Sequence, residues 1–210
     1  METEDPKRDL VTEWERLQLR MPPPAECGMA VDWSRMRESW GKEFPPDYRQ
    51  FMGLYGPGTI ESYLVIELPE CKGTPPASPY GGMLLETENA CALWEREEKA
   101  QELHDANPQL IAWGADANSD LLCWDATPDD PSTWPVLVRN RDDGLWRGYD
   151  CGMVAFLARI LHGDFTKCPL GDLSLWNIPT ASYLNEHEER RIRKQGLDPW
   201  TGEPDPYAGT

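Results

Sequence analysis

Residues 110–126 read LIAWGADANSDLLCWDA, and this stretch decides what kind of fold the chain has. Two apolar runs, each with a tryptophan, flank the segment DANSD, in which oxygen-bearing side chains occupy every second position. Such a segment is typical either of a calcium loop or of a turn between two strands. The first would give the protein a metal site, and the second would give it a scaffold.

The calcium interpretation fails at the positions that matter most. Asp116, Asn118 and Asp120 match positions 1, 3 and 5 of an EF-hand loop. Positions 6 and 12 should be glycine and glutamate, but they are Leu121 and Thr127. We therefore predict a bend between two strands, with its acids turned outward and no bound ion.

Short strands continue after this bend. Runs rich in β-branched and aromatic residues alternate with segments of turn chemistry such as TPDDPST and RDD. Connections this short favour an antiparallel meander. The predicted strands are LIAWG, DLLCWDA, WPVLVRN and GLWRGYD, at residues 110–114, 120–126, 134–140 and 144–150.

Helical spacing of apolar residues flanks these strands on both sides. The last helix, in CGMVAFLARILHG, has Asp150 as its expected N-cap and Gly163 just past its end. Because the helices flank the strands and do not alternate with them, we predict an α+β fold, an antiparallel sheet with helices packed against one face. The other predicted helices span residues 5–21, 46–55 and 84–104, a strand or strand pair spans 59–68, and a proline-rich loop spans 68–82.

The length of 210 residues predicts one main domain with appendages. Residues 1–24 form an N-terminal helix and proline linker, and 25–168 form the α+β domain. Residues 169–210 form a polar helix and an irregular tail. We find neither a membrane-spanning run nor a signal peptide, so a cytoplasmic protein is expected.

Charge is the strongest compositional signal. The chain has 20 basic and 37 acidic residues, a formal net charge of -17. Residues 84–150 contain 15 of the acids and 5 of the bases. This field repels nucleic acid and anionic membranes and attracts basic partners, although a purely solubilising surface has the same composition.

No motif predicts catalysis, a metal or a cofactor. The six cysteines include no C-x-x-C pair and are expected to be reduced thiols. Cys151, His162 and Cys168 lack the paired short spacings of a zinc site. We find no P-loop, dinucleotide or nucleophile-elbow fingerprint. We expect a protein that is not an enzyme.

The ten tryptophans divide into two groups. Trp113, Trp124 and Trp146 fall on predicted strands, where they belong to the core. Trp134, Trp176 and Trp200 lie among prolines and acids, where they are candidate partner anchors or ordinary exposed rings.

Two segments together resemble a known family. FPPDYRQFMGLYGPGTI (44–60) is similar to the early helix of the SUKH superfamily, the SMI/KNR-like proteins. The stretch from Ile111 to Gly163 is similar to that family's Trp-Gly, acidic turn, strands and closing helix. The resemblance covers residues 31–165, while the 68–82 loop and the tail depart from it. The hallmark positions are Trp113, Gly114 and Trp124, with Tyr48, Phe51 and Tyr55 in the early helix.

The resemblance implies a binding module without catalytic residues. Bacterial SUKH proteins are mostly immunity proteins that neutralise toxins, often nucleases, and others act as scaffolds. A basic toxin domain would suit the acidic surface, and the alternative is a regulator or scaffold with a non-toxin partner. We expect the contact surface to be rimmed by Asp116, Asp120, Asp125, Asp129, Asp130, Asp142 and Asp143.

Overall fold

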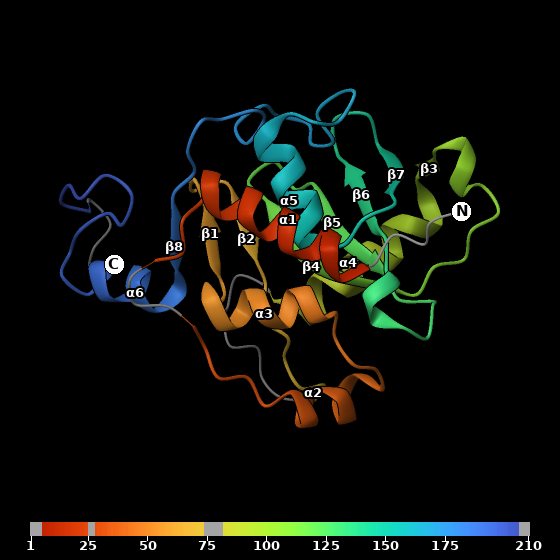
Figure 1. Ribbon diagram of the computed structural model, residues 1–210, viewed down its shortest axis with the longest axis horizontal. Coiled ribbons are helices and arrows are strands. Elements are labelled where there is room, and N and C mark those ends of the chain that lie inside the picture. The colour runs from red at the N-terminus through yellow and green to blue at the C-terminus, as the bar shows by residue number, and fades with distance from the viewer. Residues whose placement is uncertain (1–5, 25–27, 74–81, 206–210) are drawn as a thin grey trace.

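A mixed sheet of eight strands runs through the computed structural model (Figure 1). The structure describes residues 6–24, 28–73 and 82–205, and for residues 6–12 the backbone alone. The strand order is β3-β7-β6-β5-β4-β2-β1-β8, in which β3 and β7 are parallel and the other pairs antiparallel. The predicted α+β class is confirmed. The strands are β1 (Gly58–Ile60), β2 (Leu64–Ile66), β3 (Glu98–Lys99), β4 (Leu110–Asp116), β5 (Leu121–Asp125), β6 (Val136–Asn140), β7 (Leu145–Tyr149) and β8 (Tyr183–Asn185).

The four predicted strands between residues 110 and 150 form an antiparallel meander in chain order, β4 to β7. The segment 59–68 contributes the strand pair β1 and β2. Both predictions are confirmed. The strands form there because turn residues separate apolar runs of strand length. The helices are α1 (Pro6–Arg20), α2 (Trp33–Trp40), α3 (Pro46–Leu54), α4 (Met83–Arg96), α5 (Met153–His162) and α6 (Glu186–Arg193), with short 3-10 turns at Gln101–Leu103 and Pro131–Thr133.

The Trp-Gly pair interrupts the regular pairing of β4. The register with β5 shifts between Ala112 and Gly114, so Trp113 lies in a bulge and its ring is fully buried. A Cβ at position 114 would lie 2.8 Å from the carbonyl oxygen of Val65 on β2. Glycine is therefore required for the close approach of the neighbouring strand.

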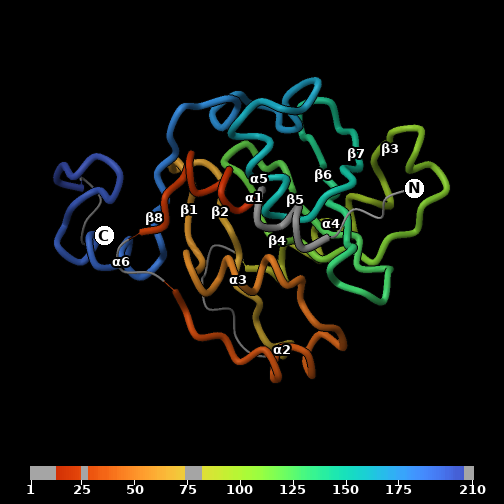
Figure 2. The backbone as a smooth tube through the Cα atoms, viewed as in Figure 1, coloured from red at the N-terminus to blue at the C-terminus, as the bar shows by residue number. Residues whose placement is uncertain are grey.

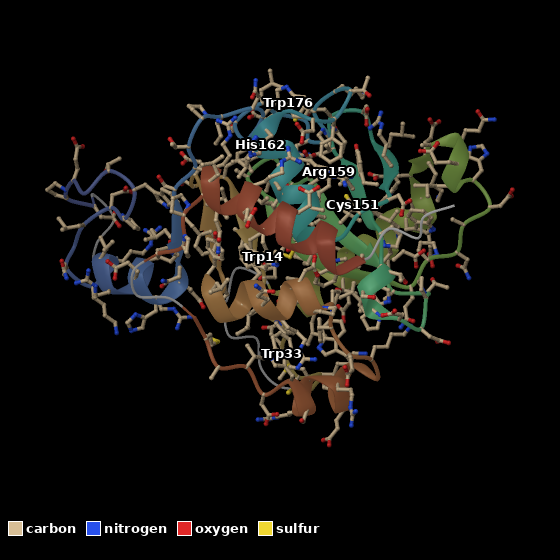
Figure 3. All side chains as sticks on the ribbon, in the orientation of Figure 1. Trp14, Trp33, Cys151, Arg159, His162 and Trp176 are labelled. Atoms are coloured by element: carbon tan, nitrogen blue, oxygen red, sulfur yellow. The ribbon has the colours of Figure 1, made fainter. Side chains whose placement is uncertain are left out.

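The main core lies between the sheet and the helices α1, α3 and α5, which Figure 1 shows in front of the strands. Tyr48 of α3 meets Trp124 of β5 at 5.0 Å between ring centroids, and Phe156 of α5 meets Trp113 at 6.1 Å. In Figure 3, Trp14 lies near the contact of α1 with α3, consistent with its stacking on Phe51. The hallmark aromatic residues are all buried: Tyr48, Phe51, Tyr55, Trp113 and Trp124.

The prediction that helices pack against one face is wrong for α4. This helix lies on the opposite face, where Ala90 and Trp94 form a second core with Cys123, Leu137 and other residues of the meander. β4, β5 and β6 are consequently buried on both faces. Strands that are buried on both faces have continuous apolar runs in their sequences. The apolar runs of these three strands are of this type.

The predicted helix 84–104 ends earlier than expected, at Arg96. Trp94 packs edge-on against Trp146 of β7 at 5.2 Å, and the chain then turns so that Glu98 and Lys99 join β7 as a short parallel strand. Cys91 of this helix is exposed. Tertiary pairing overrides helical spacing at this end.

The segments set apart as appendages contribute to the same domain. Trp14, Leu17 and Met21 of the N-terminal segment are buried in the main core. Tyr183 begins β8, which pairs with β1 at the edge of the sheet. Figure 2 shows α6 and β3 at opposite ends of the sheet. Cys27, residues 74–81 of the predicted loop and residues 206–210 of the tail lie outside the described residues.

The predicted N-cap of α5 is also wrong. Gly152, and not Asp150, is the N-cap residue, and a carboxylate from α3 satisfies the first turn. The amide of Val154 donates to Asp47 at 3.1 Å, and a Cβ at Gly152 would lie 2.8 Å from the same oxygen. The helix ends at Gly163 with φ of 71°, as predicted.

Candidate functional site

The DANSD segment is a turn between β4 and β5, as predicted. The amides of Asn118 and Asp120 each donate to one oxygen of Asp116 at 2.9 Å. Ser119 takes a left-handed conformation with φ of 68°. The Asp116 oxygen that would serve a calcium ion at the first position thus bonds the turn's own backbone. The described residues contain no group of three or more side chains that could hold a metal ion.

The acids of this turn face inward, which contradicts the prediction that they line the rim of a contact surface. Asp120 is fully buried, and its two oxygens accept hydrogen bonds from the amides of Arg141 at 2.7 Å and Gly171 at 2.6 Å. Asp116 is also buried. Unpaired backbone amides are costly to bury, so these carboxylates serve the fold. Sequence spacing alone could not show which amides they would meet.

Burial changes the ionisation of this turn. It raises the pKa of Asp116 to about 6, against the effect of the hydrogen bonds that the carboxylate accepts. Tyr63, at the start of the neighbouring strand, also has a raised pKa because of burial and because the Asp116 carboxylate lies beside it. The Asn118 amide donates to the Tyr63 hydroxyl at 3.3 Å. The amides of the turn bond only Oδ1 of Asp116, and its other oxygen, Oδ2, is buried without a hydrogen-bond partner among the described residues.

Exposed carboxylates remain at this end of the sheet, on the adjacent β6–β7 turn. Asp142 and Asp143 are both exposed. Asp143 pairs with Arg147 at 2.6 Å, which lowers the pKa of Asp143 and neutralises part of its charge. A Cβ at Gly171 would lie 3.0 Å from the Asp142 carboxyl, so the 171–173 segment runs beside the turn. We call Asp142, Asp143, Asp172 and Leu173 the turn end.

Leu173 was not singled out by sequence reasoning, yet it is the apolar feature of the turn end. Its side chain is 66% exposed. Asp172 precedes it, and the Ser174 hydroxyl and amide lower the pKa of Asp172, so this carboxylate is charged. An exposed leucine among charged carboxylates suits contact with a partner that is both apolar and basic. Only the fold brings this segment to the β6–β7 turn.

The remaining predicted rim residues lie at the other end of the meander. Asp125 ends β5, and Asp129 and Asp130 follow in the loop to β6. Asp130 caps the 3-10 turn by accepting from the Ser132 amide at 2.9 Å, which with the Ser132 hydroxyl lowers the pKa of Asp130. We call Asp125, Asp129 and Asp130 the loop end. The length of β5 separates the two ends by roughly 16 Å, so the predicted residues do not form one rim.

The candidate tryptophan anchors also divide. Trp134 is 2% exposed, and its indole nitrogen donates to the carbonyl oxygen of Pro128 at 2.8 Å. It is a core residue of the loop end and not an anchor. Trp176 and Trp200 are partly exposed.

One acidic residue that sequence reasoning missed is Glu67, just past β2. Burial and the nearby carboxylates of Glu86, Glu70 and Glu186 raise the pKa of Glu67 to about 7. These residues come from three separate parts of the chain, at 67–70, 86 and 186, so no local sequence pattern indicates the cluster.

The residues considered for catalysis or zinc are occupied elsewhere. His162 contacts the Arg20 guanidinium at 3.3 Å through one ring nitrogen and the Arg16 carbonyl oxygen at 3.2 Å through the other. Burial raises the pKa of the Cys151 thiol to about 12. The thiol of Cys168 donates to the Asp172 carbonyl oxygen. Figure 3 shows Cys151, Arg159 and His162 spread along α5 and the segment before it.

A pocket of about 430 Å³ opens beside α4. Its lining includes Trp40, Lys72 and Thr87, with the Lys72 ammonium 5.2 Å from the Trp40 ring centroid. Asp116 and Glu67, whose pKa values are raised, do not line it. The pocket therefore does not combine a cavity with an acid tuned for proton transfer.

The described helices are too short or too polar to cross a bilayer. Comparison with protein-family models finds no matching family, and comparisons with curated proteins and with solved structures find no match. The SUKH resemblance therefore stays a prediction based on the motifs quoted above.

Proposed function

We propose that this protein is a non-catalytic binding module that holds a basic protein partner on its acidic surface, and that this partner is a bacterial toxin domain which it neutralises. The observation that carries the proposal is the turn end, where the exposed Leu173 follows Asp172 in a segment that runs beside the exposed Asp142, in a chain of net charge -17. The motif resemblance to SUKH immunity proteins supports the choice of a toxin as partner.

Charge and apolar contact have separate roles in this proposal. A field of one sign raises the rate of encounter with a basic protein and disfavours wrong partners. It cannot supply tight binding alone, because salt screens exposed charges over about 8 Å at physiological ionic strength. Leu173 supplies an apolar contact that slows dissociation.

The test uses the toxin domain encoded beside the gene for this chain, with inhibition of the toxin's nuclease activity as the readout. The variant Asp142→Asn with Leu173→Ser should weaken inhibition at least about tenfold, because it removes an exposed charge and an apolar contact together. Glu15→Gln with Leu19→Ser is the matched control, since it changes an exposed acid and a leucine that is 73% exposed on α1.

Three outcomes are informative. Loss of inhibition in the first variant alone supports the proposal. Equal inhibition by both variants and the wild type removes the turn end from the contact. If no toxin is encoded beside the gene and the partner is not a toxin, the scaffold or regulatory role replaces immunity.

A further inference from the structure

A row of side chains on the α4 side of the sheet crosses four strands. Leu184, Thr59, Val65 and Ala115 are direct cross-strand partners on β8, β1, β2 and β4. Their strand neighbours point into the main core, so these four point to the opposite face. We call them the sheet row. It is roughly 14 Å long, enough to lie under two to three turns of a helix.

Ala115 packs against the core beneath α4, and the rest of the sheet row lies beside this helix. α4 packs on β4 and β5, whereas Val65 is 39% exposed and Thr59 and Leu184 are half-buried. On the other face of the sheet, β1, β2 and β8 contribute Ile60, Leu64 and Tyr183 to the main core. An exposed β-branched residue in the middle of a sheet face is suited to cover by another element.

Carboxylates border this row. Glu67 follows β2, its amide bonds the Trp113 carbonyl oxygen, and strand alternation places its side chain on the face of Val65. Glu86 in the first turn of α4 and Glu186 after β8 act on it electrostatically. Burial is the largest cause of the raised pKa of Glu67, and the neighbouring carboxylates of Glu86, Glu70 and Glu186 raise it further, so these acids lie close to Glu67. Arg190 pairs with Glu186. A partner cation beside Glu67 would lower the raised pKa of Glu67 and favour its charged form, and the half-buried Glu86 lies nearby.

We propose that the sheet row is a second docking surface, which takes a cationic amphipathic segment of a partner protein beside α4. Apolar side chains of that segment cover Val65 and Leu184, and its lysines or arginines meet Glu67 and Glu86. The negative border disfavours nucleic acid, and the net charge of -17 disfavours a second copy of this chain. The surface is separate from the turn end and stands independently of the toxin proposal.

The experiment is methyl NMR of the full chain titrated with a designed amphipathic Leu/Lys peptide, compared with a Leu/Glu peptide of the same pattern. Methyl signals of Val65 and Leu184 should shift with the first peptide only. Leu173, at the turn end, reports on binding there.

Paired variants test the charge. Glu67→Gln with Glu86→Gln should weaken the titration roughly fivefold, the effect of losing two partly exposed ion pairs. Glu88→Gln with Glu95→Gln removes the same charge from exposed positions of α4, and should change affinity less than about twofold.

Shifts of Leu173 without Val65 would overturn this inference and leave the proposed function standing. Equal weakening by the two variant pairs would also overturn it, as would equal shifts with the Leu/Glu peptide. A free protein that sediments as a dimer, and becomes monomeric in Val65→Lys, would assign the row to a second copy instead.

Discussion

The amide of Arg141 donates a hydrogen bond to the carboxylate of Asp120 at 2.7 Å, which joins the β6–β7 turn to the β4–β5 turn. The other oxygen of Asp120 accepts from the Gly171 amide, so three segments meet at one buried carboxylate. This arrangement places Asp142 beside the segment that carries Leu173. The turn end therefore depends on an acid that is itself hidden from any partner.

Asp120→Ala should destabilise the protein by roughly 2–4 kcal/mol, because two partly buried backbone amides lose the fully buried carboxylate that accepts from them. Urea unfolding measures this change. Asp129→Ala, at an exposed acid of the loop end, should stay within about 0.5 kcal/mol of the wild type. Equal stability of the two variants would show that Asp120 is not the link between the turns.

Glu67 should make stability fall as pH rises. Its pKa is raised from 4.5 to about 7, so its contribution is fully present below about pH 4.5 and is lost as pH rises through about 7. Asp116 has a shift of the same sign and adds to this slope. Glu67→Gln cannot ionise, so between about pH 5 and about pH 8 it should lose roughly 2–3 kcal/mol less stability than the wild type. Urea unfolding at both pH values measures this. An equal loss of stability in the variant and the wild type would contradict the prediction.

Asp47→Ala should cost roughly 1–3 kcal/mol, because the start of α5 loses the acceptor of the Val154 amide. Asp150→Ala is the control, since Asp150 has the sequence position of a cap but is exposed and does not occupy the N-cap position. Thermal unfolding of the two variants ranks them. A larger loss in Asp150→Ala would restore the sequence-based cap.

Trp134→Phe should lower stability by about 1 kcal/mol through the loss of the bond to Pro128, and should leave partner binding unchanged. Calorimetric unfolding and a binding titration separate these effects. A weakened partner interaction at unchanged stability would make Trp134 an anchor after all.

The sequence predicts much of the fold, because strand-length apolar runs and turn residues alternate from Leu110 to Tyr149. The N-terminal helix and the end of α5 at Gly163 follow from spacing and punctuation in the same way. What spacing could not supply is the identity of remote partners. The cap of α5 is 107 residues away from it in sequence. Spacing also could not place α4, because β4 and β5 are apolar on both faces and only the fold shows which face α4 covers.

The candidate site was less predictable than the fold. Exposed Asp142 and buried Asp120 look alike in sequence, since both follow strand ends in turn-forming segments. Only the fold separates them, because burial of a carboxylate depends on the amides that reach it. Leu173 and Val65 could not be recognised as surface residues from the sequence, because single leucines and valines are ordinary anywhere in a chain.

The most direct measurement of the central claim is the association rate with the cognate toxin domain at low ionic strength, by stopped-flow fluorescence. The variant Asp125→Asn, Asp129→Asn, Asp130→Asn and Asp142→Asn should associate about tenfold more slowly than the wild type. The control Glu15→Gln, Glu38→Gln, Glu88→Gln and Glu95→Gln removes the same charge from exposed positions of α1, α2 and α4, and should slow association less than about threefold. Equal rates for the two variants would contradict binding through the acidic ends of the meander.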